Sequence, residues 1–355
     1  MDIEILKGTE VSRSKLNKVR NFLTSADLEL DDDIDTTVCV WEDGDLVATG
    51  SRAGYLLKCI AVSEKTRGSG YMSSLMGALW QDAFQNGIEE ILVYTKPENT
   101  AIFESLFFHR LASTNDVVIL EREKGAAKRF VLNQVKKSYE EKGRSFDKYS
   151  GIDVIGAVVM NCNPFTLGHR YLVEEASKQC DSLYVFVVSE EAGEFSFDER
   201  FNLVKSGCAD LDNVYVMKTG PYLVSRASFP QYFIKGKSQV SRIKCEIDIE
   251  IFCNIFAKEL GISKRFFGSE PLSETTRTYN EAMKKYLPLK GIEPVEFERI
   301  EALGEPISAT RVRELFDELK YGQTGIACVC HRLRKLLPET SFDFLIKKAK
   351  SKFDI

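Results

Sequence analysis

The chain has 355 residues, of which 44% are hydrophobic and 28% charged. These are ordinary values for a globular protein of two or three domains. The net charge of −5 gives no reason to expect a nucleic acid partner, since nucleic acid binding is usually accompanied by a basic domain. The start is too polar for a signal peptide, and no apolar run approaches the roughly 20 residues that span a membrane. We therefore expect neither nucleic acid nor a membrane among the partners.

The nine cysteines are scattered and include no CxxC pair, so we expect reduced thiols in a cytoplasmic protein. The cluster Cys328-Val329-Cys330-His331 has the wrong spacing for a zinc site, because zinc pairs normally have two to four residues between them. We interpret it as a strand or loop with incidental thiols, and we assign no residue as a direct metal ligand.

The first hundred residues alternate β-type and helical patterns. The spacing of apolar residues predicts strands and two longer helices followed by a short one. The expected strands are Ile3–Leu6, Thr37–Trp41, Leu46–Ser51, Leu56–Val62 and Ile91–Thr95, and the expected helices are Ser14–Ser25, Met72–Asn86 and Thr100–Phe107.

A glycine loop, Arg67-Gly68-Ser69-Gly70, lies between a predicted strand and a predicted helix. Glycines there let the backbone approach a ligand closely, and free amides at the helix start can hold a pyrophosphate. In this setting the segment resembles the CoA-binding loop of Gcn5-related acetyltransferases (GNAT), whose pattern Arg67 and Gly70 match. The resemblance implies a GNAT-like α+β domain with Arg67, Gly68 and Gly70 at a CoA-type site. Met72 stands where the family has a small residue, and the sequence shows no obvious general base.

Residues 121–150 are highly charged with little periodic apolar content. We interpret them as a solvated connector that includes a strand over Arg129–Asn133. The sequence therefore predicts two domains, 1–145 and 146–355.

The second half alternates strands and helices, which predicts a parallel sheet with crossover helices. Ligands of such sheets lie outside the carboxyl ends of the strands. The expected strands are Val154–Met160, Ser182–Val188, Val214–Lys218, Lys264–Gly268 and Glu293–Arg299, and the expected helices are His169–Gln179, Phe197–Gly207, Phe252–Leu260, Thr278–Tyr286 and Ser308–Leu319.

Two segments carry the chemistry. In Asn163-Pro164-Phe165-Thr166-Leu167-Gly168-His169, Gly168 permits close approach of a nucleotide, and His169 at a helix start can donate a hydrogen bond to a phosphate oxygen. In Ile307-Ser308-Ala309-Thr310-Arg311-Val312-Arg313, two hydroxyls, helix amides and an arginine can together bind the distal phosphates of ATP.

These segments resemble the Thr-x-Gly-His and Ile-Ser-x-Thr-x-x-Arg motifs of the nucleotidyltransferase superfamily. Further matches are Glu194–Phe201, Thr219–Tyr222, Ala227–Pro230 and Phe267–Pro271. Taken in this order behind a GNAT-like domain, they make the chain resemble the citrate lyase ligase family. The expected fold is α/β overall, with a GNAT-like α+β domain followed by a Rossmann-like nucleotidyltransferase domain with a parallel sheet.

The resemblance implies an enzyme that uses ATP, with Mg²⁺ bridging the phosphates, and acetate to acetylate a thiol. That thiol belongs to the CoA-like prosthetic group on the acyl carrier subunit of citrate lyase, and acetyl adenylate is the intermediate. It implies catalytic roles for Thr166, His169 and Arg313. The implied nucleotide-binding residues are Asn163, Phe165, Gly168, Arg200, Gly268, Glu270, Ser308 and Thr310.

Two alternatives remain open at this point. One is another adenylyltransferase that acts on a phosphopantetheine or nucleotide acceptor and is indifferent to acetate. The other is a CoA- or nucleotide-binding module without turnover, against which Thr166, His169, Ser308 and Arg313 all argue.

Overall fold

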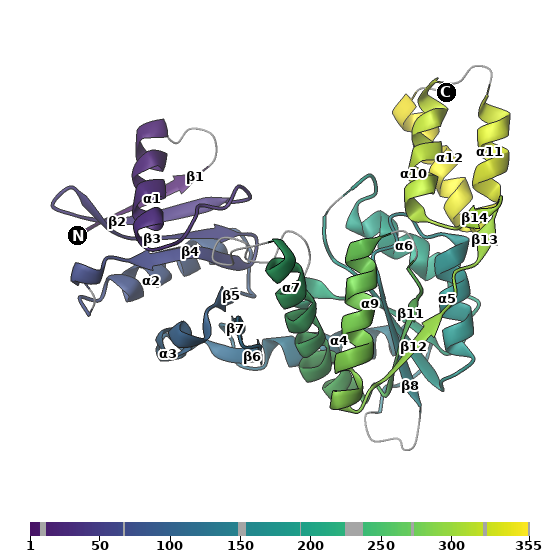
Figure 1. The fold of residues 1–355 in the computed structure, drawn as a ribbon, viewed down its shortest axis with the longest axis horizontal. Coiled ribbons are helices and arrows are strands. Elements are labelled where there is room, and N and C mark those ends of the chain that lie inside the picture. The colour runs from purple at the N-terminus through teal and green to yellow at the C-terminus, as the bar shows by residue number, and fades with distance from the viewer. Residues whose placement is uncertain are drawn as a thin grey trace. The chain divides into compact units, whose positions relative to one another are not determined.

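The computed structural model describes residues 1–7, 12–66, 68–147, 154–191, 193–223, 237–270, 273–321 and 325–353, and Figure 1 shows the course of the chain. The chain divides into two compact units. Unit 1 comprises residues 1–129 and 224–254, and unit 2 comprises residues 130–223 and 255–355. The two units interleave along the chain. The predicted division of the sequence into domains 1–145 and 146–355 is linear, and it stays a prediction.

Unit 1 contains a mainly antiparallel seven-stranded sheet in the order β1-β2-β3-β4-β5-β7-β6. The pair β4 and β5 is parallel and joined only at Leu56–Leu92 and Leu57–Val93, so the two strands separate beyond that point. The strands are β1 Asp2–Lys7, β2 Thr36–Glu42, β3 Asp45–Ala53, β4 Leu56–Val62, β5 Leu92–Thr95, β6 His109–Ser113 and β7 Val118–Glu121, and the helices are α1 Arg13–Ser25, α2 Tyr71–Gln85, α3 Thr100–Ser105 and α7 Lys237–Ile251.

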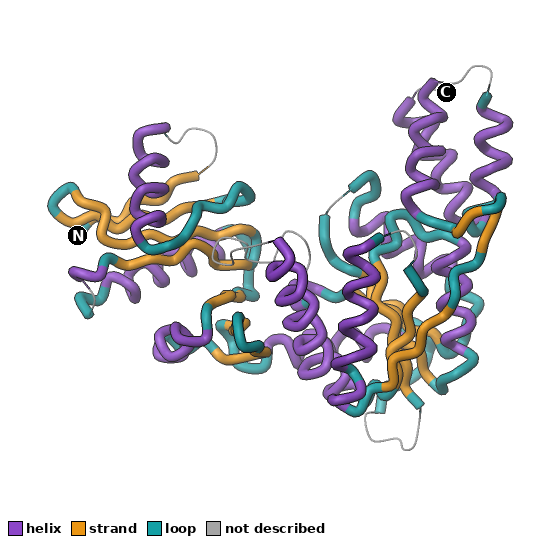
Figure 2. The backbone as a smooth tube through the Cα atoms, viewed as in Figure 1, coloured by secondary structure: helices purple, strands orange, loops and turns teal. Residues whose placement is uncertain are grey.

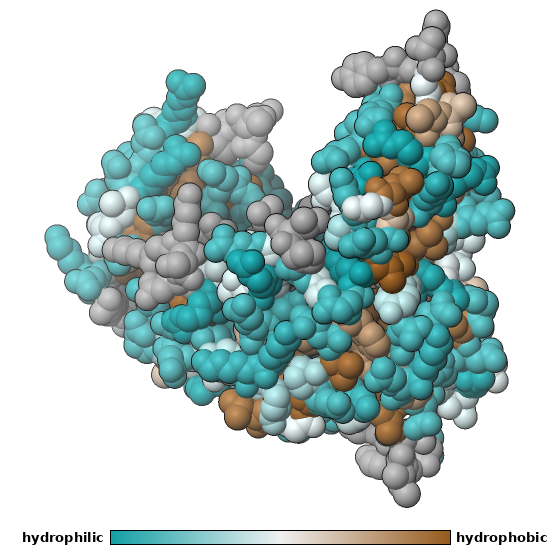
Figure 3. Space-filling model, turned by 45° about the vertical axis from the view of Figure 1, so that its right-hand side comes forward, coloured by the Kyte–Doolittle hydropathy of each residue, from teal (hydrophilic) through white to brown (hydrophobic). Residues whose placement is uncertain are grey.

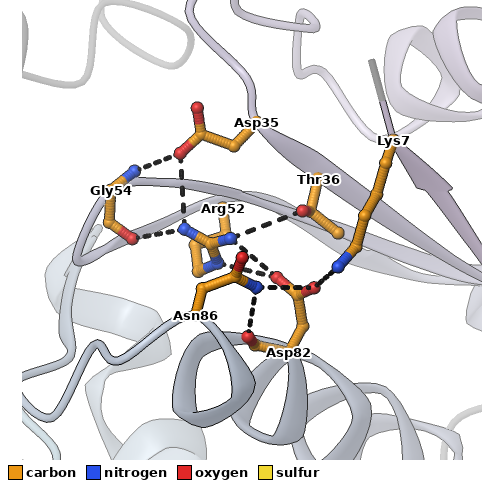
Figure 4. A network of polar contacts seen from close by, with 7 residues as sticks. All are labelled: Lys7, Asp35, Thr36, Arg52, Gly54, Asp82 and Asn86. Atoms are coloured by element: carbon orange, nitrogen blue, oxygen red, sulfur yellow. Dashed lines mark hydrogen bonds and ion pairs between the residues drawn. The ribbon is translucent and has the colours of Figure 1, made fainter.

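A buried ion-pair network ties α2 to the sheet of unit 1 (Figure 4). The Arg52 guanidinium donates to Asp82 on α2 at 2.8–2.9 Å, and Lys7 from β1 pairs with the same carboxylate. Arg52 is 3% exposed and Asp82 1% exposed. Arg52 and Lys7 hold the pKa of Asp82 below its usual value against the opposing effect of burial. The network fixes the helix that begins directly after the glycine loop.

Unit 2 contains a five-stranded parallel sheet in the order β10-β9-β8-β11-β12, and Figure 2 shows helices packed around it. The parallel sheet confirms the expected α/β organisation. The strands are β8 Ile155–Met160, β9 Ser182–Val187, β10 Val214–Lys218, β11 Lys264–Gly268 and β12 Glu293–Phe297, and the helices are α5 Leu167–Ser177, α6 Phe197–Gly207, α8 Lys258–Leu260, α9 Glu274–Tyr286, α10 Ala309–Glu318, α11 Ile326–Arg334 and α12 Glu339–Phe353.

Shorter elements complete the units. They are the 3₁₀ turns Glu64–Thr66, Pro97–Asn99, Gly220–Tyr222, Pro288–Lys290 and Leu319–Tyr321, the π-helical segment Phe252–Ala257, and the short strand pair β13 Glu301–Ala302 and β14 Glu305–Pro306.

Two local predictions were wrong. The segment expected to be a connector with a strand over Arg129–Asn133 is helix α4, Ala126–Glu140. Its residues Val131 and Val135 are buried, and Tyr139 stacks on Tyr215 with ring centroids 3.9 Å apart. Residues 328–331, expected in a strand or loop, lie in α11, and α12 was not anticipated.

The face of the molecule in Figure 3 is largely hydrophilic, with apolar side chains in small patches. Among the helices of the described residues, none combines the length and the apolar character needed to cross a bilayer.

Candidate active site

His169 is held by the loop that follows β8. Thr166 is the N-cap of α5, and its hydroxyl accepts a hydrogen bond from the backbone N–H of His169. In return, the backbone N–H of Thr166 donates to Nδ1 of His169 at 3.1 Å. A ring nitrogen that accepts from an N–H carries no proton itself. The neutral imidazole therefore has its proton on Nε2, which becomes a donor fixed by the start of the helix.

The surroundings of His169 favour the neutral ring. Burial, and secondarily the positive charge of Arg299, lower the pKa of His169 from 6.5 to about 4. Phe165 is fully buried and stacks against the imidazole with ring centroids 5.9 Å apart. Near neutral pH, His169 is thus a hydrogen-bond donor without a full charge, and Phe165 supports the ring from within the core.

The second motif begins α10. The Ser308 hydroxyl caps this helix by accepting from the backbone N–H of Arg311 at 3.2 Å. Arg313 donates to the backbone carbonyl of Asn163 at 2.5 Å and to the Thr310 hydroxyl at 3.0 Å. The arginine therefore joins the two motifs, which are 150 residues apart in the sequence.

A cavity of about 490 Å³ opens between these motifs. From the first motif it is lined by Thr166, Gly168 and His169, and from the second by Ser308 and Thr310. An adjoining cavity of about 610 Å³ shares Ser308 and Thr310 and adds Arg311 and Arg332. The start of α10 and these cations make the combined space suitable for anionic ligands. Both cavities are also lined by Glu270, Ser273 and Arg299.

Gly168 of the first motif lies beside Ile307 of the second. A Cβ atom added there would lie 3.4 Å from the backbone oxygen of Ile307, in van der Waals contact with the second motif. Asn163 is buried and lines neither cavity, and it follows the buried Cys162. The loop is therefore a tightly packed support for Thr166 and His169.

Arg200, predicted to bind a nucleotide, does not line either cavity. It is 0% exposed. Its Nη1 donates to the backbone and side-chain oxygens of Asn161 at 2.7 and 2.8 Å and to the carbonyl of Val188 at 3.0 Å, and its Nη2 donates to Glu190. Arg200 thus joins the loops that follow β8 and β9.

Gly268 ends β11 and Glu270 follows it, and both line the 490 Å³ cavity, as expected from the sequence. Arg299 was missed. Its Nε donates to the carbonyl of Ser269 at 2.7 Å, and its Nη2 pairs with Glu270. Its position directly after the strand β12, at the ligand-binding edge of the sheet, is a signal that could have identified it.

The described residues contain no group of three or more His, Cys, Asp or Glu side chains placed to hold a metal ion. Of the carboxylates around the cavities, Glu270 is paired with Arg299 and Glu305 with Arg311. This donor set suits Mg²⁺ that is bound mainly through substrate phosphates, which is its usual mode in ATP-dependent sites.

Unit 1 has a separate cavity of about 660 Å³. It lies where β4 and β5 separate, and its lining includes Gly68, Gly70 and Met72 from the glycine loop and the start of α2. Gly68 and Gly70 have positive φ values of 87° and 80°, a conformation that glycine adopts readily. Arg67, the predicted pyrophosphate ligand, lies outside the described residues.

Two family models match the chain. The citrate lyase ligase C-terminal domain matches residues 155–345, and the acetyltransferase (GNAT) family matches residues 10–104. These matches confirm the two expected domain types.

Full-length relatives are also similar. The chain is 36% identical over 354 residues to the [citrate [pro-3S]-lyase] ligase of Klebsiella pneumoniae, covering 98% of each chain. It is 37% identical over 348 residues to the Escherichia coli (strain K12) protein of the same name, covering 94% of this chain and 96% of that one. A phosphopantetheine adenylyltransferase of Streptococcus gordonii is 34% identical over 113 residues, which is 30% of this chain and 69% of the relative.

Proposed function

Because the chain belongs to the citrate lyase ligase family, and is therefore a ligase, we propose that it activates citrate lyase by ATP-dependent acetylation of a carrier-bound thiol. The proposed acceptor is the thiol of the CoA-like prosthetic group on the acyl carrier subunit, and acetate is the acyl donor. The observation that carries this proposal is the pair of motifs around one cavity, with the Nε2–H of His169 fixed by Thr166.

In the proposed reaction, acetate attacks the α-phosphorus of ATP and pyrophosphate leaves, which produces acetyl adenylate. The carrier thiol then attacks the acetyl carbon and releases AMP. His169 donates from Nε2 to an α-phosphate oxygen as its negative charge increases in the transition state. Such catalysis depends on positioning and charge stabilisation without a covalent protein intermediate.

The distal phosphates are assigned to the start of α10. Its free amides, the Ser308 and Thr310 hydroxyls and the nearby cations are suitable donors for them. Mg²⁺ held by the phosphates would neutralise part of their charge. Arg313 is proposed to position Asn163 and Thr310, to which it is bonded.

For unit 1, we propose that its 660 Å³ cavity receives the pantetheine-like arm of the prosthetic group. The cavity is bordered by Gly68 and Gly70, whose backbone lets a phosphorylated ligand approach closely. Substitution of Arg67 by glutamate tests this assignment, since a loss of affinity for the prosthetic-group thiol is expected. Unchanged affinity would contradict it.

The main test is pyrophosphate release from ATP with and without acetate, and with and without deacetylated carrier. We expect release to depend on acetate and to be abolished in His169→Ala while the protein stays folded by circular dichroism. The similarity to a phosphopantetheine adenylyltransferase keeps one alternative in view. AMP transfer to phosphopantetheine, with no effect of acetate, would favour that activity instead.

A further inference from the structure

A second, smaller groove lies next to the 660 Å³ cavity of unit 1. It measures about 300 Å³ and runs between α2 and the segment that follows α3. The two spaces share the side chains Ser73, Ser105 and Leu106. A ligand in the large cavity can therefore continue into the groove without leaving the surface of the unit.

The groove is walled by aromatic rings and one cation. Trp80 is 45% exposed and Phe107 is 70% exposed. The Arg122 guanidinium lies 3.9 Å from the centroid of the Trp80 ring, and it also donates to the backbone carbonyl of Phe107 at 3.2 Å. Flat rings beside a cation are the features that bind purine bases and their phosphates.

Phe107 occupies an unfavourable backbone position. It comes directly after the C-cap of α3 and has a φ of 62°. Helices usually have glycine at this place, because a side chain in the left-handed region is strained. A large aromatic side chain that is both strained and exposed contributes little to folding, and a strained residue of this kind points to a role in ligand binding.

We propose that the groove walled by Trp80, Phe107 and Arg122 binds the adenine nucleotide end of the CoA-like arm, by stacking of the base on its aromatic side chains. This inference rests on the proposed function, which places the pantetheine-like part of the same arm in the adjoining cavity. It adds a specificity: the ligand must carry adenosine as well as the thiol-bearing arm.

The test compares dephospho-CoA with 4′-phosphopantetheine, which lacks the adenosine. The chain has two tryptophans, so the full-length Trp41→Phe variant reports on Trp80 alone. We expect dephospho-CoA to bind about tenfold more tightly, which is the order of one base stacked on an aromatic ring. We also expect it to quench the Trp80 emission, whereas 4′-phosphopantetheine leaves the emission unchanged.

Phe107→Gly separates binding from folding. Glycine removes the strain, so this variant should melt at the same or a higher temperature and yet bind dephospho-CoA about tenfold more weakly. Phe84→Ala is the matched control, because Phe84 is also an exposed aromatic residue (74%) but does not line the groove. Its affinity for dephospho-CoA should not change.

Equal affinities for the two ligands, with no quenching, would overturn the groove assignment and leave the arm cavity in place. Binding of neither ligand would overturn both assignments in unit 1. Acetate-dependent pyrophosphate release is measured on the same preparations and does not involve the groove. If acetate-dependent pyrophosphate release is observed with either of these binding results, the adenylation chemistry proposed for unit 2 holds independently of the assignments in unit 1.

Discussion

Arg200→Met is the most informative single substitution, because it distinguishes a structural role of Arg200 from phosphate binding. Methionine approximates the length and apolar stem of arginine but removes four hydrogen bonds, three to backbone carbonyls and one to the Asn161 side chain. Their acceptors come from two loops at the active-site edge of the sheet. The substitution therefore disconnects those loops without adding a charge or a bulky group.

The expected loss of stability follows from burial. Hydrogen bonds from a charged donor contribute about 1.5–3 kcal/mol each. Burial lowers the pKa of Arg200, so the cost of burying its charge offsets part of that sum. We expect a net loss of about 3 kcal/mol in the free energy of unfolding, which corresponds to a fall of roughly 6–12 °C in the melting temperature of unit 2.

The assay combines calorimetry with ATP kinetics. If Arg200 only positions the loops, Arg200→Met and Arg200→Lys should both lower the melting temperature, and kcat for pyrophosphate release should fall with it. If Arg200 instead binds a phosphate, Arg200→Lys should keep the melting temperature and raise KM for ATP. An unchanged melting temperature with weakened ATP binding would refute the positioning role.

Four other substitutions or conditions test the remaining assignments. His169→Asn should lower kcat for acetate-dependent pyrophosphate release by about 10²–10³-fold with little change in melting temperature, because it removes one transition-state donor; a loss below fivefold would contradict the assignment. The folded-state pKa of His169 is lowered from 6.5 to about 4, so the unfolded chain binds more protons between these values and the wild type should lose about 3 kcal/mol of stability as the pH falls from 6.5 to 4. His169→Asn lacks this titration, so urea unfolding should show the two proteins nearly equal above pH 6.5 and the wild type about 3 kcal/mol less stable than the variant at pH 4; the same pH dependence in both would contradict the lowered pKa. Gly207→Ala places a Cβ atom 2.5 Å from the Phe165 ring, so it should lower the free energy of unfolding by about 1–3 kcal/mol and also lower kcat. Denaturant unfolding and pyrophosphate release measure the two effects, and unchanged stability would show that Phe165 can move freely. Asp82→Asn removes the carboxylate that Arg52 and Lys7 share, and leaves Arg52 only the ion pair with Asp35. It should destabilise unit 1 by about 3 kcal/mol while kcat for acetate-dependent pyrophosphate release is kept; an equal loss of both would show that the units depend on each other.

Local sequence patterns were sufficient where neighbouring residues determine the geometry. Ser308 lies at the helix start where its motif predicted it, whereas Thr166 caps a helix that begins two residues before its predicted start at His169. The alternation of strands and helices predicted the parallel sheet, and the conjunction of two motifs predicted that they would meet at its edge.

Sequence reasoning failed where the partner of a residue is distant in the chain. Helix α4 was missed because charged residues dilute its apolar pattern, and its partner Tyr215 lies 76 positions after Tyr139. The acceptors of Arg200 on Asn161, Val188 and Glu190 come together only in the folded sheet, so its structural contacts were not foreseen, and its predicted role in phosphate binding stays a prediction. Arg299 belongs to no sequence motif, and we recognised it only because it lines both cavities of unit 2.

The interleaving of the two units has a consequence for any attempt to separate them. Helix α7 packs against β6, and Arg242 of α7 pairs with Asp116 at 3.0 Å. Since α7 follows β10 and precedes β11 in the chain, no single cut yields two fragments that each retain all their own parts. A chain shortened to its C-terminal half would carry α7 without the sheet that covers it. Point substitutions are therefore better suited than truncation to separating the roles of the two units.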